Sequence, residues 1–309
     1  MAISASMVKE LREMTGAGMM ECKKALTETD GDMDAAVEVL RKSGAAKAEK
    51  KASRIAAEGI CRAAIEGNTA AVVEVNSETD FVAKNEVFQT YVEAVAKQAL
   101  ASSLNGGKDG QDIEAFVAEA WNEDASKTVK DVLVEKTATI GEKLSIRRFE
   151  KVSGDVVVSY LHGGGRIGVL VAADGASDDA AKEALANIAM QIAALNPQFI
   201  SDKDVDQSYI DHEKEIIKAQ IENDPKEAAK PDKVKDGMVM GRINKQLKEV
   251  VLMDQVYVKA EDGKQSVAKY LESVNKDLVV TKFVRFEVGE GMQKREENFA
   301  EEVAKQMNK

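Results

Sequence analysis

Residues 58–76 read EGICRAAIEGNTAAVVEVN and set the architecture of the chain. Two β-compatible runs, 58–66 and 69–76, stand on either side of Gly67 and Asn68. A Gly-Asn pair between two such runs is typical of the turn of an antiparallel hairpin. We therefore predict a hairpin at this point of the sequence.

A helix and a closing strand complete the unit that the hairpin begins. After the polar stretch 77–85, apolar residues recur at helical spacing. These residues are Phe88, Tyr91, Val92, Val95, Ala99 and Leu100. Two shorter helices, about 112–121 and 127–139, lead to a predicted strand over 143–152. This order of elements is typical of an α+β unit.

The same order of elements occurs a second time. Predicted strands at 155–161 and 166–173 flank a glycine turn, and a helix follows over 178–195. A helix at 265–274 and a strand at 278–288 come much later. The first closing strand contains Arg148-Phe149-Glu150, and the second contains Arg285-Phe286-Glu287. We interpret the core as two copies of one antiparallel hairpin-plus-helix unit.

Helical segments surround this duplicated core. Residues 4–54 predict a three-helix bundle whose third helix ends before Ser43-Gly44. Residues 199–255 predict two antiparallel helices that form a protruding coiled-coil arm, and 292–307 predict a short amphipathic helix. We predict an N-terminal helical domain at 1–55, a first core lobe at 56–152, and a second core lobe made of 153–198 and 256–289. The arm takes 199–255, and the C-terminal module takes 290–309.

Composition excludes several classes of function. The 309 residues include 43 Lys and Arg against 54 Asp and Glu, a net charge of -11, which argues against a nucleic-acid or anionic-membrane binder. No apolar run reaches the ~18 residues of a membrane span, and no signal peptide opens the sequence. Two cysteines and two histidines make a disulfide framework or a multi-ligand zinc site improbable. We expect a cytoplasmic protein with no metal or cofactor of its own.

Two features resemble catalytic or nucleotide motifs without their context. Residues 163–168 satisfy GxGxxG, but a dinucleotide site needs a helix to begin there, and the apolar run 169–171 predicts a strand instead. His162 lies beside that turn, and no serine or cysteine is placed by the sequence as its nucleophile partner. A surface histidine is the more common interpretation, so we predict no catalytic residue and no enzyme; an enzyme that uses His162 remains an outside alternative.

The segment from Glu78 to Lys84 puts Phe81 into a polar connection between a strand and a helix. One interpretation is that Phe81 folds inward as a helix staple. The other is an exposed apolar wedge beside a carboxylate, which a partner could bury as a recognition anchor. The pair Met19-Met20 allows the same two readings, ordinary core or adaptable contact.

Three runs resemble the bacterial elongation factor Ts family. Residues 11–26 read LREMTGAGMMECKKAL and resemble the N-terminal signature of that family, and residues 74–84 read EVNSETDFVAK and resemble its second signature. Residues 283–291, FVRFEVGEG, are similar to the family's ending. The resemblance covers essentially the whole chain.

The resemblance implies a guanine nucleotide exchange factor that acts on elongation factor Tu in translation elongation. It implies a ubiquitin-associated-like N-terminal domain, a dimerisation arm that allows a homodimer, and a C-terminal module. The segment Thr79, Asp80, Phe81 and Val82 is tied in the family to dislodging magnesium from the GTPase. Further partner contacts are implied at Met19, Met20, Lys23, Ile140, Gly141, His162 and Val258.

Two positions depart from the family pattern: Lys259 stands where an apolar residue is expected, and the triple-glycine turn beside His162 is longer than usual. The alternative from another class is a non-catalytic adaptor whose N-terminal bundle binds a peptide or a ubiquitin-like partner.

Overall fold

A computed structural model describes residues 3–293 of the chain. Its first elements are three helices, α1 (Ala5–Thr15), α2 (Met19–Glu28) and α3 (Met33–Lys51). Leu11, Cys22 and Leu26 are fully buried between them and form a small core of their own. The side chains of Ser4 and Asp32 cap α1 and α3, because each accepts a hydrogen bond from a backbone amide of the first turn.

The third helix corrects one prediction. It does not end before Ser43-Gly44 but runs unbroken to Lys51. Gly44 is buried, and a Cβ placed on it would lie 3.4 Å from the Cβ of Ala138 in α7 (Val129–Ile140). The glycine therefore permits close packing of two helices instead of stopping one of them.

The first lobe is a three-stranded antiparallel sheet in the order β1-β2-β5, covered on one face by helices. Its strands are β1 (Glu58–Glu66), β2 (Thr69–Ser77) and β5 (Ser145–Ser153). Its helices are α4 (Asp80–Ala83), α5 (Glu86–Ala101), α6 (Ile113–Ala118) and α7. A short hairpin, β3 (Ala120–Trp121) with β4 (Asp124–Thr128), lies where the two shorter helices were predicted to end and begin.

The second lobe repeats this plan. Its sheet has the order β6-β7-β8, with β6 (Val156–His162), β7 (Ile167–Asp174) and β8 (Val279–Glu287). Helices α8 (Asp179–Leu195) and α12 (Val267–Val274) pack on its outer face. The three glycines at 163–165 form the β6–β7 turn with positive φ angles, so the dinucleotide-site interpretation is excluded as predicted.

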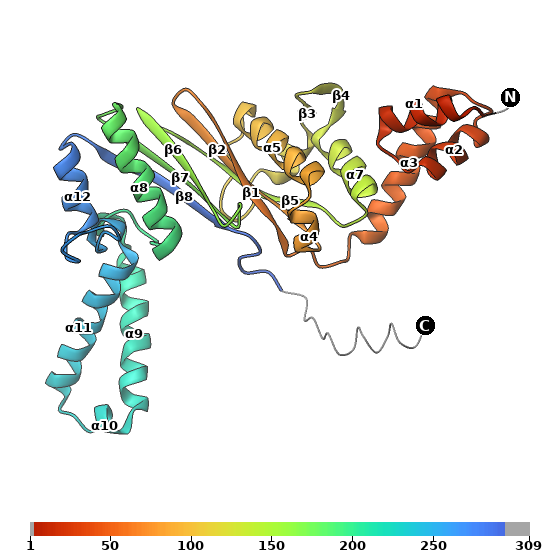
Figure 1. Cartoon of the computed structure of the whole chain (residues 1–309). Coiled ribbons are helices and arrows are strands. Elements are labelled where there is room, and N and C mark those ends of the chain that lie inside the picture. Colours follow the sequence, from red (N-terminus) through yellow and green to blue (C-terminus); the bar gives the residue numbers. More distant parts are fainter. Residues whose placement is uncertain (1–2, 294–309) are drawn as a thin grey trace.

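The two sheets face each other in the middle of the molecule (Figure 1). Their inner faces share a buried apolar core that includes Cys61, Val72, Leu170 and Phe286. The amide of Cys61 donates a 2.7 Å hydrogen bond to the carbonyl of Gly165, which joins the sheets directly. The core is therefore helix, sheet, sheet and helix in layers, and the predicted α+β class is confirmed.

Strand register shows that the lobes are equivalent, but not through the repeated tripeptide. Phe149 pairs with Val73 two residues after a bulge at Arg147, and Phe283 pairs with Val171 two residues after a bulge at Thr281. Phe149 and Phe283 both face the helices, whereas Phe286 faces the other sheet. The Arg-Phe-Glu match is therefore three residues out of register with the structural repeat.

A buried glutamine occupies the same place in each lobe. Gln98 in α5 accepts a hydrogen bond from the amide of Asn122 and donates one to the carbonyl of Ala120. Gln191 in α8 does the same with the amide of Val258 and the carbonyl of Val256. Each glutamine thus provides hydrogen-bond partners for one backbone amide and one backbone carbonyl of the extended segment beside its helix.

The insertion in the second lobe forms a protruding helical pair (Figure 1). It consists of η1 (Asp202–Asp204), α9 (Gln207–Asn223), α10 (Pro225–Ala228), α11 (Asp232–Val250) and η2 (Leu252–Asp254). Ile217, Ile221, Val239 and Ile243 form its core. The spacing of Met240, Ile243, Leu247 and Val250 predicts that Met240 lies in this seam, but Met240 is exposed, because Val239 takes the inward position.

The predicted C-terminal helix at 292–307 lies almost wholly outside the described residues. Among the residues that the structure describes, no helix is both long enough and apolar enough to cross a membrane.

Candidate partner-binding site

The segment Thr79–Val82 forms a single helical turn rather than an irregular connection. Thr79 is the N-cap of α4, and its hydroxyl accepts a hydrogen bond from the amide of Val82 at 3.3 Å. The second lobe has no such turn, because only residues 175–178 separate β7 from α8. The duplication thus provides an internal comparison, and it identifies α4 as an addition that the fold of a lobe does not need.

Phe81 points away from the protein. Its side chain is 81% exposed, whereas Val82 is half-buried against the first-lobe core and Ala83 is buried. The inward staple interpretation of Phe81 is therefore wrong. A large exposed aromatic ring on a short turn is a typical recognition anchor.

Glu142, in the connection between α7 and β5, holds the turn in place. Its Oε2 accepts hydrogen bonds from the amides of Glu78 and Thr79 at 3.1 and 3.0 Å, and its Oε1 accepts one from the hydroxyl of Thr79 at 2.7 Å. The sequence pattern does not predict this contact, because no periodicity links a carboxylate to partners more than sixty positions away.

A second set of contacts joins the same region to the end of the N-terminal bundle. The carboxylate of Glu78 accepts from the amide of Lys143 at 2.6 Å and from the guanidinium of Arg54 at 3.2 Å. The ammonium of Lys143 in turn donates to the carbonyls of Ala52 and Arg54. The chain after α3, the end of β2 and the chain after α7 therefore meet at one point.

Asp80 lies beside Phe81 and forms an exposed ion pair with Lys84 at 2.7 Å. The hydrogen bond from Lys84 lowers the pKa of Asp80 below its ordinary value. The carboxylate is consequently charged at neutral pH and stands next to the exposed ring.

The structure brings Ile140 and Gly141 to this same place. They end α7 and directly precede Glu142, and Gly141 adopts the left-handed conformation of a C-cap, with φ +87°. Ile140 packs against the first-lobe core, and Gly141 is exposed. Two runs that are far apart in the sequence therefore form one surface with Phe81.

The remaining predicted contacts lie on other parts of the molecule. Met19, Met20 and Lys23 are exposed at the start of α2, with Met19 59% and Met20 73% exposed. His162 is exposed at the end of β6, and its Nδ1 lies 3.1 Å from the hydroxyl of Tyr160. Val258 is 49% exposed, and its amide is held by Gln191.

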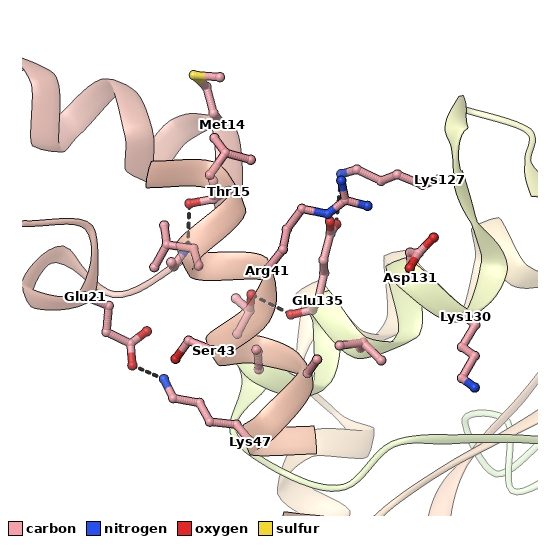
Figure 2. Close-up of a pocket in the computed structure, with 18 of the residues that line it drawn as sticks. Met14, Thr15, Glu21, Arg41, Ser43, Lys47, Lys127, Lys130, Asp131 and Glu135 are labelled. Carbon is pink, nitrogen blue, oxygen red and sulfur yellow. Dashed lines mark hydrogen bonds and ion pairs between the residues drawn. The ribbon is translucent and has the colours of Figure 1, made fainter. Parts of the chain in front are cut away.

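A separate cleft of about 500 Å³ lies between the N-terminal bundle and the first lobe (Figure 2). Its walls come from the end of α1, the start of α2, the connection between them, α3, β4 and α7. Glu21 pairs with Lys47 on one side, and Glu135 pairs with Lys127 at 2.9 Å on the other. The predicted site residues are not part of its lining, so the exposed apolar surfaces and not this cleft are the candidate site.

Exposed apolar side chains on the bundle and on both lobes are typical of a protein that acts by binding one large partner over several surfaces. The comparisons with known proteins agree with this class. The family model described as Elongation factor TS matches residues 78–290.

The full-length relatives include the proteins named Elongation factor Ts of Clostridium perfringens strain ATCC 13124, 52% identical with 98% of each chain covered, and of Clostridioides difficile strain 630, 51% identical with 99% of each chain covered. The chain belongs to the elongation factor Ts family, and it is a translation elongation factor.

Proposed function

We propose that this chain is a guanine nucleotide exchange factor, which binds elongation factor Tu with GDP and promotes release of the nucleotide. The observation that carries the proposal is the exposed ring of Phe81, held on a turn that only the first lobe possesses. A large aromatic ring that a rigidly held turn keeps exposed is the kind of side chain that a partner buries as an anchor.

Exchange needs no covalent chemistry. A GTPase holds GDP through backbone amides, a lysine and an octahedral Mg²⁺ that loses its water reluctantly. A binding protein speeds release when it binds the empty form more tightly than the loaded form. The nucleotide and the binding protein then each lower the affinity of the GTPase for the other. The proposed role is therefore differential binding, and no residue of this chain acts as a catalytic acid, base or nucleophile.

The required free energy calls for more than one contact. To shift the equilibrium between the nucleotide-bound and the empty GTPase 10⁴-fold, a binding protein needs about 5.5 kcal/mol of differential affinity for the two forms. Burial of one phenylalanine contributes roughly 1.5–3 kcal/mol. We assign Phe81 to an apolar gap beside the magnesium site of the partner, with Asp80 as its charged neighbour and Thr79 and Val82 as the frame. Met19, Met20 and Lys23 of the bundle, Ile140 and Gly141, and His162 and Val258 of the second lobe supply the remainder.

The setting of this activity is also proposed. Translation elongation places the protein in the cytoplasm, where its partner is found. The arm carries exposed Met240 and Ile216 outside its own core, which supports a role in homodimer formation. The arm is the part of the second lobe that the repeat does not contain.

The test is release of fluorescent GDP from elongation factor Tu. Addition of the purified chain should accelerate release in proportion to its concentration until the GTPase is saturated, and excess GDP should reverse binding. An adaptor would bind through its N-terminal bundle without changing the release rate, and that result would remove the proposed function.

A further inference from the structure

We propose that Glu142 is the positioning residue of the Phe81 turn: it touches no nucleotide and acts by fixing the turn in the orientation that engages the partner. This inference rests on the proposed function and assigns to it a residue outside the implied contacts. Its basis is the three hydrogen bonds that one carboxylate accepts from Glu78 and Thr79.

The turn cannot hold its own shape. It has only four helical residues, Asp80–Ala83, and so short a helix is not stable alone, because nucleation fixes several torsion angles for few hydrogen bonds. Glu142 compensates for this at the N-cap. The Thr79 hydroxyl donates to Glu142 and accepts from the amide of Val82, so the carboxylate orients the hydroxyl toward the amide that follows Phe81.

The second lobe shows that such a tether is not a requirement of the fold. There the β7–α8 connection packs Gly175 directly against the backbone of Asp277, and the amide of Gly175 donates a 2.9 Å hydrogen bond to the carboxylate of Asp155, which directly precedes β6. Among the described residues, no carboxylate from the chain that leads into β8 is hydrogen-bonded to this connection, as Glu142 before β5 is in the first lobe. The tether and the extra turn therefore occur together in the first lobe and are both absent from the second.

The tether also explains why Ile140 and Gly141 belong to the same surface as Phe81. They immediately precede Glu142, so the carboxylate fixes both segments relative to each other. Loss of this one side chain should therefore loosen the whole surface while leaving its apolar groups in place.

The experiment compares Glu142→Ala with Glu135→Ala in the full chain. Glu135 is the matched control, because it is a half-buried glutamate of α7, the helix that precedes Glu142, and its partner is Lys127 and not the turn. At saturating factor, Glu142→Ala should slow GDP release from elongation factor Tu about tenfold, which corresponds to about 1.4 kcal/mol. The concentration for half-maximal release should change less than about twofold, as for an interaction made only at the displacement step. Glu135→Ala should match the unsubstituted chain.

Two further measurements separate positioning from simple stability. In a Phe81→Ala background, Glu142→Ala should slow release by less than about twofold more, because a residue that acts through Phe81 has nothing left to position. Amide hydrogen exchange at Asp80–Ala83 of the free chain should rise in Glu142→Ala and stay unchanged in Glu135→Ala. Glu142→Gln, which keeps one acceptor oxygen, should fall between Glu142→Ala and the unsubstituted chain.

If Glu142→Ala leaves both the rate of GDP release and amide hydrogen exchange unchanged, the inference is wrong, although the nucleotide-exchange function would stand. The inference is also wrong if the rate loss of Glu142→Ala adds fully to that of Phe81→Ala. If Glu142→Ala does not fold, the same comparisons made with Glu142→Gln decide the matter. If the unsubstituted chain itself does not accelerate GDP release, the proposed function is wrong. Amide hydrogen exchange alone then tests whether Glu142 orders the turn.

Discussion

Asp80 and Lys84 set the charge beside the exposed ring, and their pairing makes a prediction about pH. The hydrogen bond from Lys84 lowers the pKa of Asp80. The ion pair is therefore fully formed at pH values above the ordinary pKa of an aspartate, and it is lost as the pH falls through the lowered pKa of Asp80. Lys84→Met should raise the pKa of Asp80 back toward its ordinary value. Titration of the carboxyl carbon by NMR measures this directly, and an identical titration curve in both proteins would contradict it.

Phe81 and Phe88 lie seven residues apart and should behave oppositely in stability measurements. Phe88 is fully buried in the first-lobe core, so Phe88→Ala should lower the free energy of unfolding by about 3–5 kcal/mol. Phe81→Ala removes little buried surface and should change it by less than about 0.5 kcal/mol. Urea denaturation of the two variants checks the pair, and a loss of several kcal/mol for Phe81→Ala would mean that the ring is buried in solution.

At this scale the sequence predicts candidates but not their environment. The pattern of the helix at 88–100 predicted its buried face correctly. It could not predict whether Phe81 is buried, because an isolated aromatic residue in a polar connection carries no periodicity. It also could not predict Glu142, since that carboxylate meets Thr79 only after the sheet and α7 have formed.

Elements were predictable where their signals are local. The Gly67-Asn68 turn and the glycines at 163–165 predicted both hairpins, and the helical spacing of apolar residues within 199–255 predicted the arm. Gly44 misled the prediction of α3 because its role is set by Ala138, a contact between distant segments. The β3–β4 hairpin was missed because each of its strands is very short.

The arm makes a prediction at the scale of elements. Its base is closed by hydrogen bonds from the amides of Gln198 and Phe199 to the carbonyl of Val250, and its core is separate from that of the second lobe. Replacement of residues 206–248 by a short glycine-rich bridge should therefore leave a folded protein that still accelerates GDP release. Sedimentation equilibrium should show reduced self-association. Loss of both folding and exchange would mean that the arm is part of the core.

A buried ion pair within the first sheet also contacts the chain at the end of the second lobe. Glu74 and Arg148 are buried and joined at 2.6 Å, and Glu74 also accepts from the amide of Gly289, while Arg148 donates to the carbonyl of Glu287. The equivalent pair in the second sheet is Ala172 and Lys282, so a lobe folds without this ion pair. Its role is to fix the end of the second lobe against the first.

Arg148→Met should therefore destabilise the protein by at most about 3–5 kcal/mol, because the buried carboxylate of Glu74 loses its 2.6 Å partner and keeps only Arg147 as a cationic partner. Glu74→Leu combined with Arg148→Met should cost less than Arg148→Met alone, since the fully buried carboxylate is then gone and the remaining cation, Arg147, is partly exposed. Denaturant titration of the three proteins measures this order. A double variant that is less stable than the single one would contradict the proposed origin of the effect.

At the scale of the molecule, duplication was predictable from the order of elements but not from the sequence match that suggested it. The Arg-Phe-Glu tripeptides differ in register, and the true equivalence of Phe149 with Phe283 appears only through strand pairing. That equivalence in turn isolates α4 as the added turn. The candidate site therefore follows from comparing the two lobes, a comparison that needs both sheets in place.

The central claim is that Phe81 assists release of magnesium and GDP from elongation factor Tu. The most direct test is the stopped-flow rate of GDP release at saturating factor, measured for the unsubstituted chain, Phe81→Ala and Met20→Ala, with Mg²⁺ present and chelated. With Mg²⁺ present, Phe81→Ala should slow release roughly tenfold or more and by more than Met20→Ala. Chelation should shrink this defect, because the step that Phe81 assists has then already occurred. A Phe81→Ala protein as fast as the unsubstituted chain with Mg²⁺ present, or a defect of the same size after chelation, would contradict the account.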